Sequence, residues 1–425
     1  MFKRIPFVSL GMLFAFIASS AFAQQDFTSM NNVPTESGTE ATYQNFAPLA
    51  ISSQPDFLSS DSPNPGTDIK GNPGGLTNLI SVPNFQGSFQ SQGITWPFTM
   101  MGNQPALGHK TSIPTRIVAV SLELQNADLV TTTLVPVSGF EQPTLGSPNF
   151  QDTDYSSGNQ LQFADAVQRA EFFNNMKQNW HTELNPATIV DRITIQVPRF
   201  VTVTLNGRPT QVRTYFTGKA ADGSTFVLLL NRFFNQAIFN TVVNEINANH
   251  YTTDAMNIAL FPNTFLFSLG RSGGIGGCCT LGFHTYFTDG GNPESRWVFA
   301  YASWISPGLF GAGFEDVTAL SHEISESFND PFLDNAVPAW MFPGRPGTCQ
   351  DNLETGDPVE VLQNGTVSIP IKNRSNTFTY HPQTEALLQW FEQGSTSDAL
   401  NGAFSYPDTT ALTHSATPFG KLTCR

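Results

Sequence analysis

Residues 316–329 constrain the fold of this 425-residue chain most, because they separate into two chemically different faces of one helix. At about 100° per residue, four apolar side chains fall within roughly 60° of one another. They are Val317, Leu320, Ile324 and Phe328. The other side of the helix carries one imidazole and three carboxylates, which are His322, Glu323, Glu326 and Asp330. One face is therefore expected to pack in a core, while the other gathers negative charge.

This concentration of charge predicts a metal site. Carboxylates crowded beside a histidine repel one another unless solvent screens them or a cation neutralises them. In a His-Glu-x-x-His helix, residues four apart share a face and bind zinc, and the intervening glutamate takes a proton from the bound water. Here Glu326 stands where the second histidine would be. We expect His322 and Glu326 to bind the metal and Glu323 to act as general base; a solvated acidic face and a buried carboxylate network without metal are the alternatives.

Zinc is the expected ion, although two anionic ligands also suit the harder ions Mn²⁺ and Ca²⁺. Downstream of the helix, a glycine-containing loop returns Glu354 and Asp357. We expect Glu354 to be a third metal ligand, and Asp330 and Asp357 to orient the ligands from behind. His284 has three readings: a metal ligand, a hydrogen-bond donor to the transition state, or a core histidine bonded to backbone.

Several of these residues resemble a known family, the secreted phosphate-induced proteins of the EXORDIUM-like type and their exported bacterial relatives. Four features carry the resemblance: Cys278-Cys279 with Gly282-Phe283-His284, the strand 297–306, His322-Glu323-x-x-Glu326-x-x-x-Asp330-Pro331 with Trp340, and Glu354-x-x-Asp357. Phe283 departs from the tyrosine or tryptophan more usual there. The resemblance implies an extracellular or cell-envelope protein with a metallopeptidase-like core, and it implies no particular substrate.

The first 23 residues have the order of a secretory signal peptide: Lys3 and Arg4, then an apolar stretch, then Ala21-Phe22-Ala23. No later apolar run is long enough to cross a bilayer, and no cysteine follows the expected cleavage site, so we expect a secreted protein, periplasmic or extracellular, without a membrane anchor. Without the signal, 18 basic residues stand against 34 acidic ones, a net charge of −16. That balance argues against nucleic acid as a partner.

Four cysteines, at positions 278, 279, 349 and 424, predict disulfides in an oxidising compartment. Three pairings are open. Cys349 with Cys424 would pin the C-terminus, whereas a bridge between the neighbours Cys278 and Cys279 needs an unusual ring, so cross-pairing is equally open. The spacings do not fit a zinc ribbon.

The expected fold class is α+β, with a zincin-like metal helix, in one metal-binding domain over 111–425 that follows an extended low-complexity arm over 24–110. Helical periodicity predicts helices over 161–180, 235–250 and 316–329, packed mainly on one face of a mixed sheet. Apolar runs and alternation predict strands over 116–124, 129–137, 189–203, 210–230, 258–261 and 297–305.

These features favour an exported metal-dependent hydrolase of the peptidase type. The ion would lower the pKa of its water, Glu323 would remove the proton, and a peptide or cell-envelope polymer would be the substrate. The rival interpretation is a non-catalytic cell-envelope or carbohydrate-binding protein in which the same residues hold a structural cation. The two differ in the site itself, because a catalytic site needs an open coordination position whereas a structural one is closed by protein atoms.

Overall fold

The computed structural model describes residues 79–155, 160–289, 292–310, 313–341, 349–360, 362, 365–373, 376–413, 416–417 and 420–421. The expected signal peptide and most of the expected arm lie outside these residues. The described helices are α1 (Glu141–Leu145), α2 (Phe163–Glu171), α3 (Asn231–Asn247), α4 (Thr318–Asn329) and α5 (Leu388–Phe391). None of them has the length and apolar character that a membrane crossing requires.

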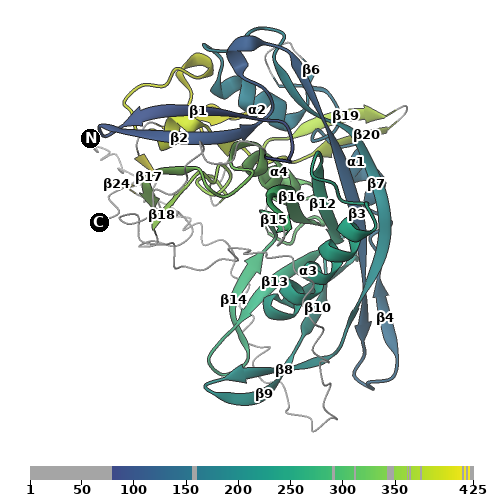
Figure 1. Ribbon diagram of the computed structural model, residues 1–425. Coiled ribbons are helices and arrows are strands. Elements are labelled where there is room, and N and C mark those ends of the chain that lie inside the picture. Colours follow the sequence, from purple (N-terminus) through teal and green to yellow (C-terminus); the bar gives the residue numbers. More distant parts are fainter. Residues whose placement is uncertain are drawn as a thin grey trace, which may run out of the picture.

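A six-stranded mixed sheet forms the centre of the molecule (Figure 1). Its strands are β3 (Lys110–Gln125), β4 (Thr132–Val135), β7 (His181–Val197), β12 (Met256–Pro262), β15 (Gly282–Asp289) and β16 (Asn292–Trp304). The strand β12 lies between β3 and β16 and is parallel to both, and β7 is parallel to β3. The strand β15 is antiparallel to β16 and forms one edge of the sheet.

Helices cover both faces of this sheet. Alternate residues of the central strands belong to two separate cores: Phe261 and Tyr301 pack with α3, whereas Leu260 and Ala302 pack with α4. A strand covered on both sides carries apolar residues at nearly every position, as 258–261 and 298–302 do. The prediction of helices mainly on one face is therefore wrong, because a continuous apolar run marks a sheet buried from both sides.

A smaller four-stranded sheet and several strand pairs extend this core. The smaller sheet has the order β10 (Tyr215–Lys219), β11 (Thr225–Leu230), β13 (Thr264–Leu269) and β14 (Ile275–Thr280), so that β14 is an edge strand. The antiparallel pairs are β5 (Thr153–Asp154) with β6 (Gln160–Leu161), β8 (Phe200–Leu205) with β9 (Arg208–Arg213), β17 (Ala336–Met341) with β18 (Cys349–Asn352), β19 (Ile369–Asn373) with β20 (Asn376–Tyr380), β21 (Glu385–Ala386) with β22 (Ser405–Tyr406), and β23 (Ala416–Thr417) with β24 (Gly420–Lys421).

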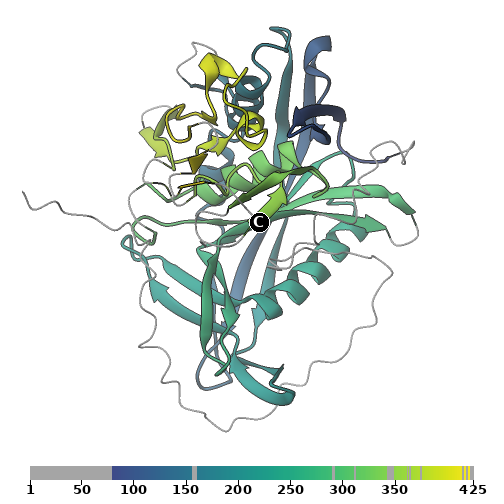
Figure 2. The same ribbon diagram turned by 90° about the vertical axis from the view of Figure 1, so that its left-hand side faces the viewer.

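The end of the expected N-terminal arm is folded. Strands β1 (Asn84–Ser91) and β2 (Ile94–Met101) form an antiparallel hairpin. Figures 1 and 2 show this hairpin at the same end of the molecule as the yellow C-terminal segments. Its Phe85 and Phe98 share a core with Trp340 and Trp390. The arm boundary at residue 110 is therefore wrong for residues 84–101, because their apolar partners, from Phe172 and Trp180 to Trp390, lie about 75 to 300 residues away in the sequence.

The three predicted helices are present with shifted bounds. The α4 helix spans Thr318–Asn329, close to the predicted 316–329, and α3 starts four residues earlier than predicted because it follows β11 directly. The α2 helix stops at Glu171 instead of reaching residue 180. There the Glu171 carboxylate accepts a hydrogen bond from Leu388 N (2.7 Å) and its carbonyl accepts one from Gln389 (2.9 Å). A distant segment thus ends this helix, which periodicity alone does not show.

Candidate metal centre

The charged face of α4 is buried. The apolar side chains Leu320, Ile324 and Phe328 pack against the central sheet, as the periodicity predicts. The opposite face is covered by β15, by the loop that follows β18, and by the segment around β21. As a result Glu323 and Glu326 are only 4% and 3% exposed. A solvated acidic helix face is therefore excluded, and the charges must be balanced inside the protein.

One group of potential ligands surrounds His322. Its Nε2 lies 3.1 Å from Glu326 Oε1 and 3.7 Å from Asp357 Oδ1. Its Nδ1 lies 3.3 Å from Gln383 Oε1, so a proton on Nδ1 would be donated to that amide oxygen. In that tautomer Nε2 presents a lone pair to the two carboxylates, which is the arrangement of a metal-binding histidine held by a second residue.

A second group surrounds His284, which β15 brings to the same helix. Its Nδ1 lies 3.2 Å from Glu326 Oε2, 3.7 Å from Glu354 Oε2 and 3.8 Å from Glu323 Oε2. No hydrogen-bond partner faces His284 Nε2 or Glu323 Oε2, although both atoms are buried. His284 is thus not a core histidine bonded to backbone, and it belongs to the site.

The histidines and carboxylates of the two groups shift one another's pKa values. Burial alone would lower the pKa of His284, but the carboxylates of Glu354, Glu323 and Glu326 raise it well above its ordinary value. Burial likewise opposes ionisation of Glu326, yet His322 and His284 together hold its pKa well below the usual range. Burial raises the pKa of Glu323. Without a cation, both histidines would keep protons that a metal ion has to displace.

Glu354 was expected to bind the metal with His322 and Glu326, and Asp357 to orient these ligands, but the structure has the two residues the other way round. Asp357 lies beside His322 and Glu326 in one group of atoms all within 4.8 Å of one another, whereas Glu354 is near His284. Asp330 ends α4 and accepts hydrogen bonds from Asp334 N (3.0 Å) and Asn335 N (3.2 Å). Burial raises its pKa to about 8. Asp330 therefore holds the turn after the helix.

Two residues of the site, Gln383 and Glu385, were not predicted from the sequence. Gln383 contacts His322, and its amide donates to Gly356 O (2.7 Å). Glu385 is fully buried, and neither of its carboxylate oxygens has a partner at hydrogen-bond distance. Burial raises the pKa of Glu385 well above its ordinary value. Their only sequence signal is a pair of polar residues beside the apolar run 386–388.

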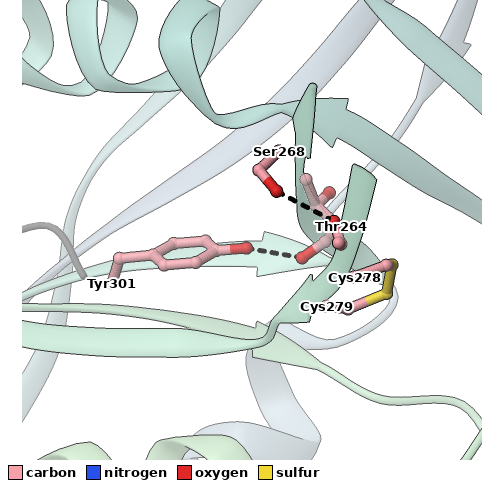
Figure 3. The surroundings of a disulfide bond; sticks show 6 residues. Thr264, Ser268, Cys278, Cys279 and Tyr301 are labelled. Carbon is pink, nitrogen blue, oxygen red and sulfur yellow. Dashed lines mark hydrogen bonds between the residues drawn. A yellow bond between two sulfur atoms is a disulfide. The ribbon is translucent and has the colours of Figure 1, made fainter. Parts of the chain in front are cut away.

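Cys278 and Cys279 form a disulfide with each other in β14 (Figure 3). Of the pairings left open, the structure has the one between neighbours, next to Thr264 and Ser268. Only Leu281 separates β14 from β15, so the disulfide lies in the segment that leads to His284. Cys349 is also disulfide-bonded, and Cys424 lies outside the described residues.

Three of the remaining histidines are each paired with a carboxylate. His181, His250 and His381 each place Nδ1 within 2.8 Å of a carboxylate, from Asp165, Glu245 and Asp316 respectively. Each of these imidazoles is partly exposed and contacts its carboxylate partner directly. In each pair the imidazole and the carboxylate hydrogen-bond to each other, whereas several buried polar atoms around α4 have no such partner.

Gly356 is required by the position of His322. A β-carbon at residue 356 would lie 2.3 Å from His322 Nδ1, while Gly356 N donates to Glu326 Oε1 (3.1 Å). We expect Gly356→Ala to displace the imidazole and to weaken metal binding about 10- to 100-fold. Titration of the metal-stripped protein with Zn²⁺ measures this. Gly139→Ala, where nothing lies within 4 Å of the added carbon, is the control; equal affinity of both variants would contradict the role of Gly356.

No protein-family model, no curated protein and no solved structure matches this chain. The function is therefore inferred from the residues around α4 themselves.

Proposed function

We propose that this protein is an exported, metal-dependent hydrolase that cleaves peptides or a related amide-bonded polymer of the cell envelope. One observation carries the proposal: five carboxylates and two imidazoles gather around α4, buried or only partly exposed, and several of their polar atoms have no hydrogen-bond partner. The carboxylates are Glu323, Glu326, Glu354, Asp357 and Glu385. A carboxylate network without metal would instead have to take up protons, which a divalent cation would replace.

The donor set fits a divalent cation. Imidazole nitrogen together with carboxylate oxygen suits zinc, and a larger share of carboxylate suits manganese or calcium. His322, Glu326 and Asp357 would hold the ion, with Glu354 or His284 as a further ligand, and α4 would then be a zincin-like metal helix. A bound divalent ion supplies Lewis acidity for attack on a carbonyl.

Glu323 would accept the proton in this reaction. It follows His322 directly on α4, it is buried, and burial raises its pKa toward the range that a general base needs. Gly282 allows the Glu323 side chain to lie close to the backbone of β15, because a β-carbon at residue 282 would lie 2.5 Å from Glu323 Oε1. His284, on the other side of Glu326, is in reach to donate a hydrogen bond to developing negative charge.

The site is more accessible on one side, which favours catalysis over a purely structural cation. The side-chain exposure rises from 4% at Glu326 to 12% at His322, 14% at Glu354 and 20% at Asp357. Substrate and water would approach from the side of the loop that carries Glu354 and Asp357. A structural ion in a cell-envelope or carbohydrate-binding protein would instead be closed off by protein atoms on all sides.

Removing His322 tests the proposal directly. We expect His322→Ala in the mature chain to lose the ion and, with it, hydrolysis of fluorescein-labelled casein, because the imidazole is the one neutral ligand beside Glu326 and Asp357. Metal content by plasma mass spectrometry and fluorescence release are the two measurements, and His181→Ala is the matched control. A metal-loaded protein that cleaves neither casein nor an envelope peptide would favour the structural-cation alternative.

The proposed export and the EXORDIUM-like resemblance are in keeping with each other. Both predict a protein that acts outside the cytoplasm, and the disulfide between Cys278 and Cys279 suits an oxidising compartment. The resemblance brings no substrate, so the peptide class is proposed from the chemistry of the site. Sequencing the N-terminus of the exported protein would place the cleavage after Ala23 if the signal peptide is as proposed.

A further inference from the structure

Glu326 turns its two carboxylate oxygens toward two different histidines. Oε1 lies 3.1 Å from His322 Nε2, and Oε2 lies 3.2 Å from His284 Nδ1. Across the part of the chain that the structure describes, closely spaced donor atoms form one group with His322, Glu326 and Asp357 and a separate one with His284, Glu323 and Glu326. Glu326 belongs to both groups, and neither group contains both histidines.

The distances within each group match the spacing of donors around an ion. Ligands bound at about 2.0–2.2 Å in a tetrahedral site lie roughly 3.3–3.6 Å from each other. His284 Nδ1 and Glu323 Oε2 are 3.8 Å apart, too far for a hydrogen bond, and Glu323 Oε2 has no other partner although its residue is only 4% exposed. An unpartnered, buried oxygen that faces an imidazole nitrogen across this distance points to a ligand between them.

We propose that the site binds two divalent cations, with Glu326 as the carboxylate that bridges them. His322 and Asp357 complete the first position, and His284 and Glu323 complete the second, with Glu354 beside it. Glu323 would bind the second ion through Oε2, the oxygen that faces His284, and keep Oε1 as the proton acceptor. Two-ion hydrolases hold their ions about 3.5–4 Å apart, a separation that one carboxylate can span. This inference rests on the proposed function, because it adds a second ion to the same site.

Metal stoichiometry tests the second ion without relying on activity. The mature chain would be stripped with chelator and titrated with Mn²⁺, with metal content and electron paramagnetic resonance as readouts. We expect two equivalents per chain and the spectrum of a spin-coupled pair. His322→Ala and His284→Ala should each retain at most one equivalent and lose the coupling, while circular dichroism confirms that both variants are folded.

The control is His250→Ala, which removes the imidazole of a separate group of possible ligands formed with Asp191 and Glu245. It should keep two equivalents and the coupled spectrum. Loss of one ion in this variant alone would place the second ion at the surface and overturn the inference. One equivalent in the wild type, lost in His322→Ala and kept in His284→Ala, would refute the second ion and leave the proposed hydrolase intact. Absence of any bound metal would sink both.

Discussion

Glu323→Gln is expected to lower hydrolysis by about 10²- to 10⁴-fold while the protein keeps its ion at His322. Glutamine has nearly the same shape and retains an oxygen, but it cannot accept a proton. The carboxylate is buried, it is the residue next to His322 on α4, and its Oε2 has no hydrogen-bond partner. The expected loss is in kcat with at least the ion at His322 still bound, measured by steady-state kinetics and plasma mass spectrometry on one preparation.

The matched control is Glu123→Gln in β3, which removes a carboxylate that only accepts hydrogen bonds from Thr132 and Gln196 near the surface. It should leave both activity and metal content unchanged. If Glu323→Gln retained full activity with its metal in place, Glu323 could not be the general base, and the proposed mechanism would have to be abandoned.

The metal-free protein is expected to become less stable as the pH rises from 5 to 8. Burial raises the pKa of Glu385, Glu354 and Asp357 well above their ordinary values. The surrounding carboxylates also outweigh burial at His322 and raise its pKa well above 6.5. The folded, metal-free protein therefore binds more protons than the unfolded chain in this range. Its stability is greatest below the unfolded pKa values and is lost as the pH rises through the folded ones.

The measurement is the melting temperature of the chelated and the metal-loaded protein at several pH values. One pKa unit corresponds to about 1.4 kcal/mol, so several groups that titrate in the same direction should lower the melting temperature of the chelated form by roughly 10 °C between pH 5 and 8. In the loaded form the ion replaces the protons, and the curve should be flatter. The lowered pKa of Glu326 acts with the opposite sign, but only below about pH 4.5.

Glu171 provides an internal reference for this experiment. Burial raises its pKa to about 8, and its carboxylate accepts a hydrogen bond from Leu388 N, away from α4. It should therefore titrate equally in both forms and cancel in their difference. Parallel curves for the chelated and loaded protein would show that the charges around α4 are not balanced by a cation.

The α4 helix illustrates what local pattern can predict. The positions of its apolar residues and of His322, Glu323 and Glu326 follow from 3.6 residues per turn, which depends on the backbone alone. The apolar runs 258–261 and 297–305 likewise predicted strands; β12 contains the first, and β16 contains the second up to Trp304. Apolar and polar residues do not alternate in these runs, which indicates that both faces of the sheet are covered. The prediction of helices on one face did not take this into account.

The partners of α4 could not be predicted in the same way. Gln383 and Glu385 reach His322 and its neighbours across about 60 residues of sequence, and no spacing rule relates them to the helix. Glu354 and Asp357 were found as a pair, but which of them faces His322 depends on the path of the loop and on the absence of a side chain at Gly356. Contacts between distant segments are decided by packing.

The sequence by itself determined that one helix has an apolar face and a face with a histidine and several carboxylates, because side-chain direction along a helix is set by its geometry. Only the tertiary structure decided that this charged face is buried, that β15 delivers His284 to it, and that Glu326 lies between two histidines. The reason is physical: the effect of a charge depends on how much water and which opposite charges surround it, and those surroundings come from residues far apart along the chain.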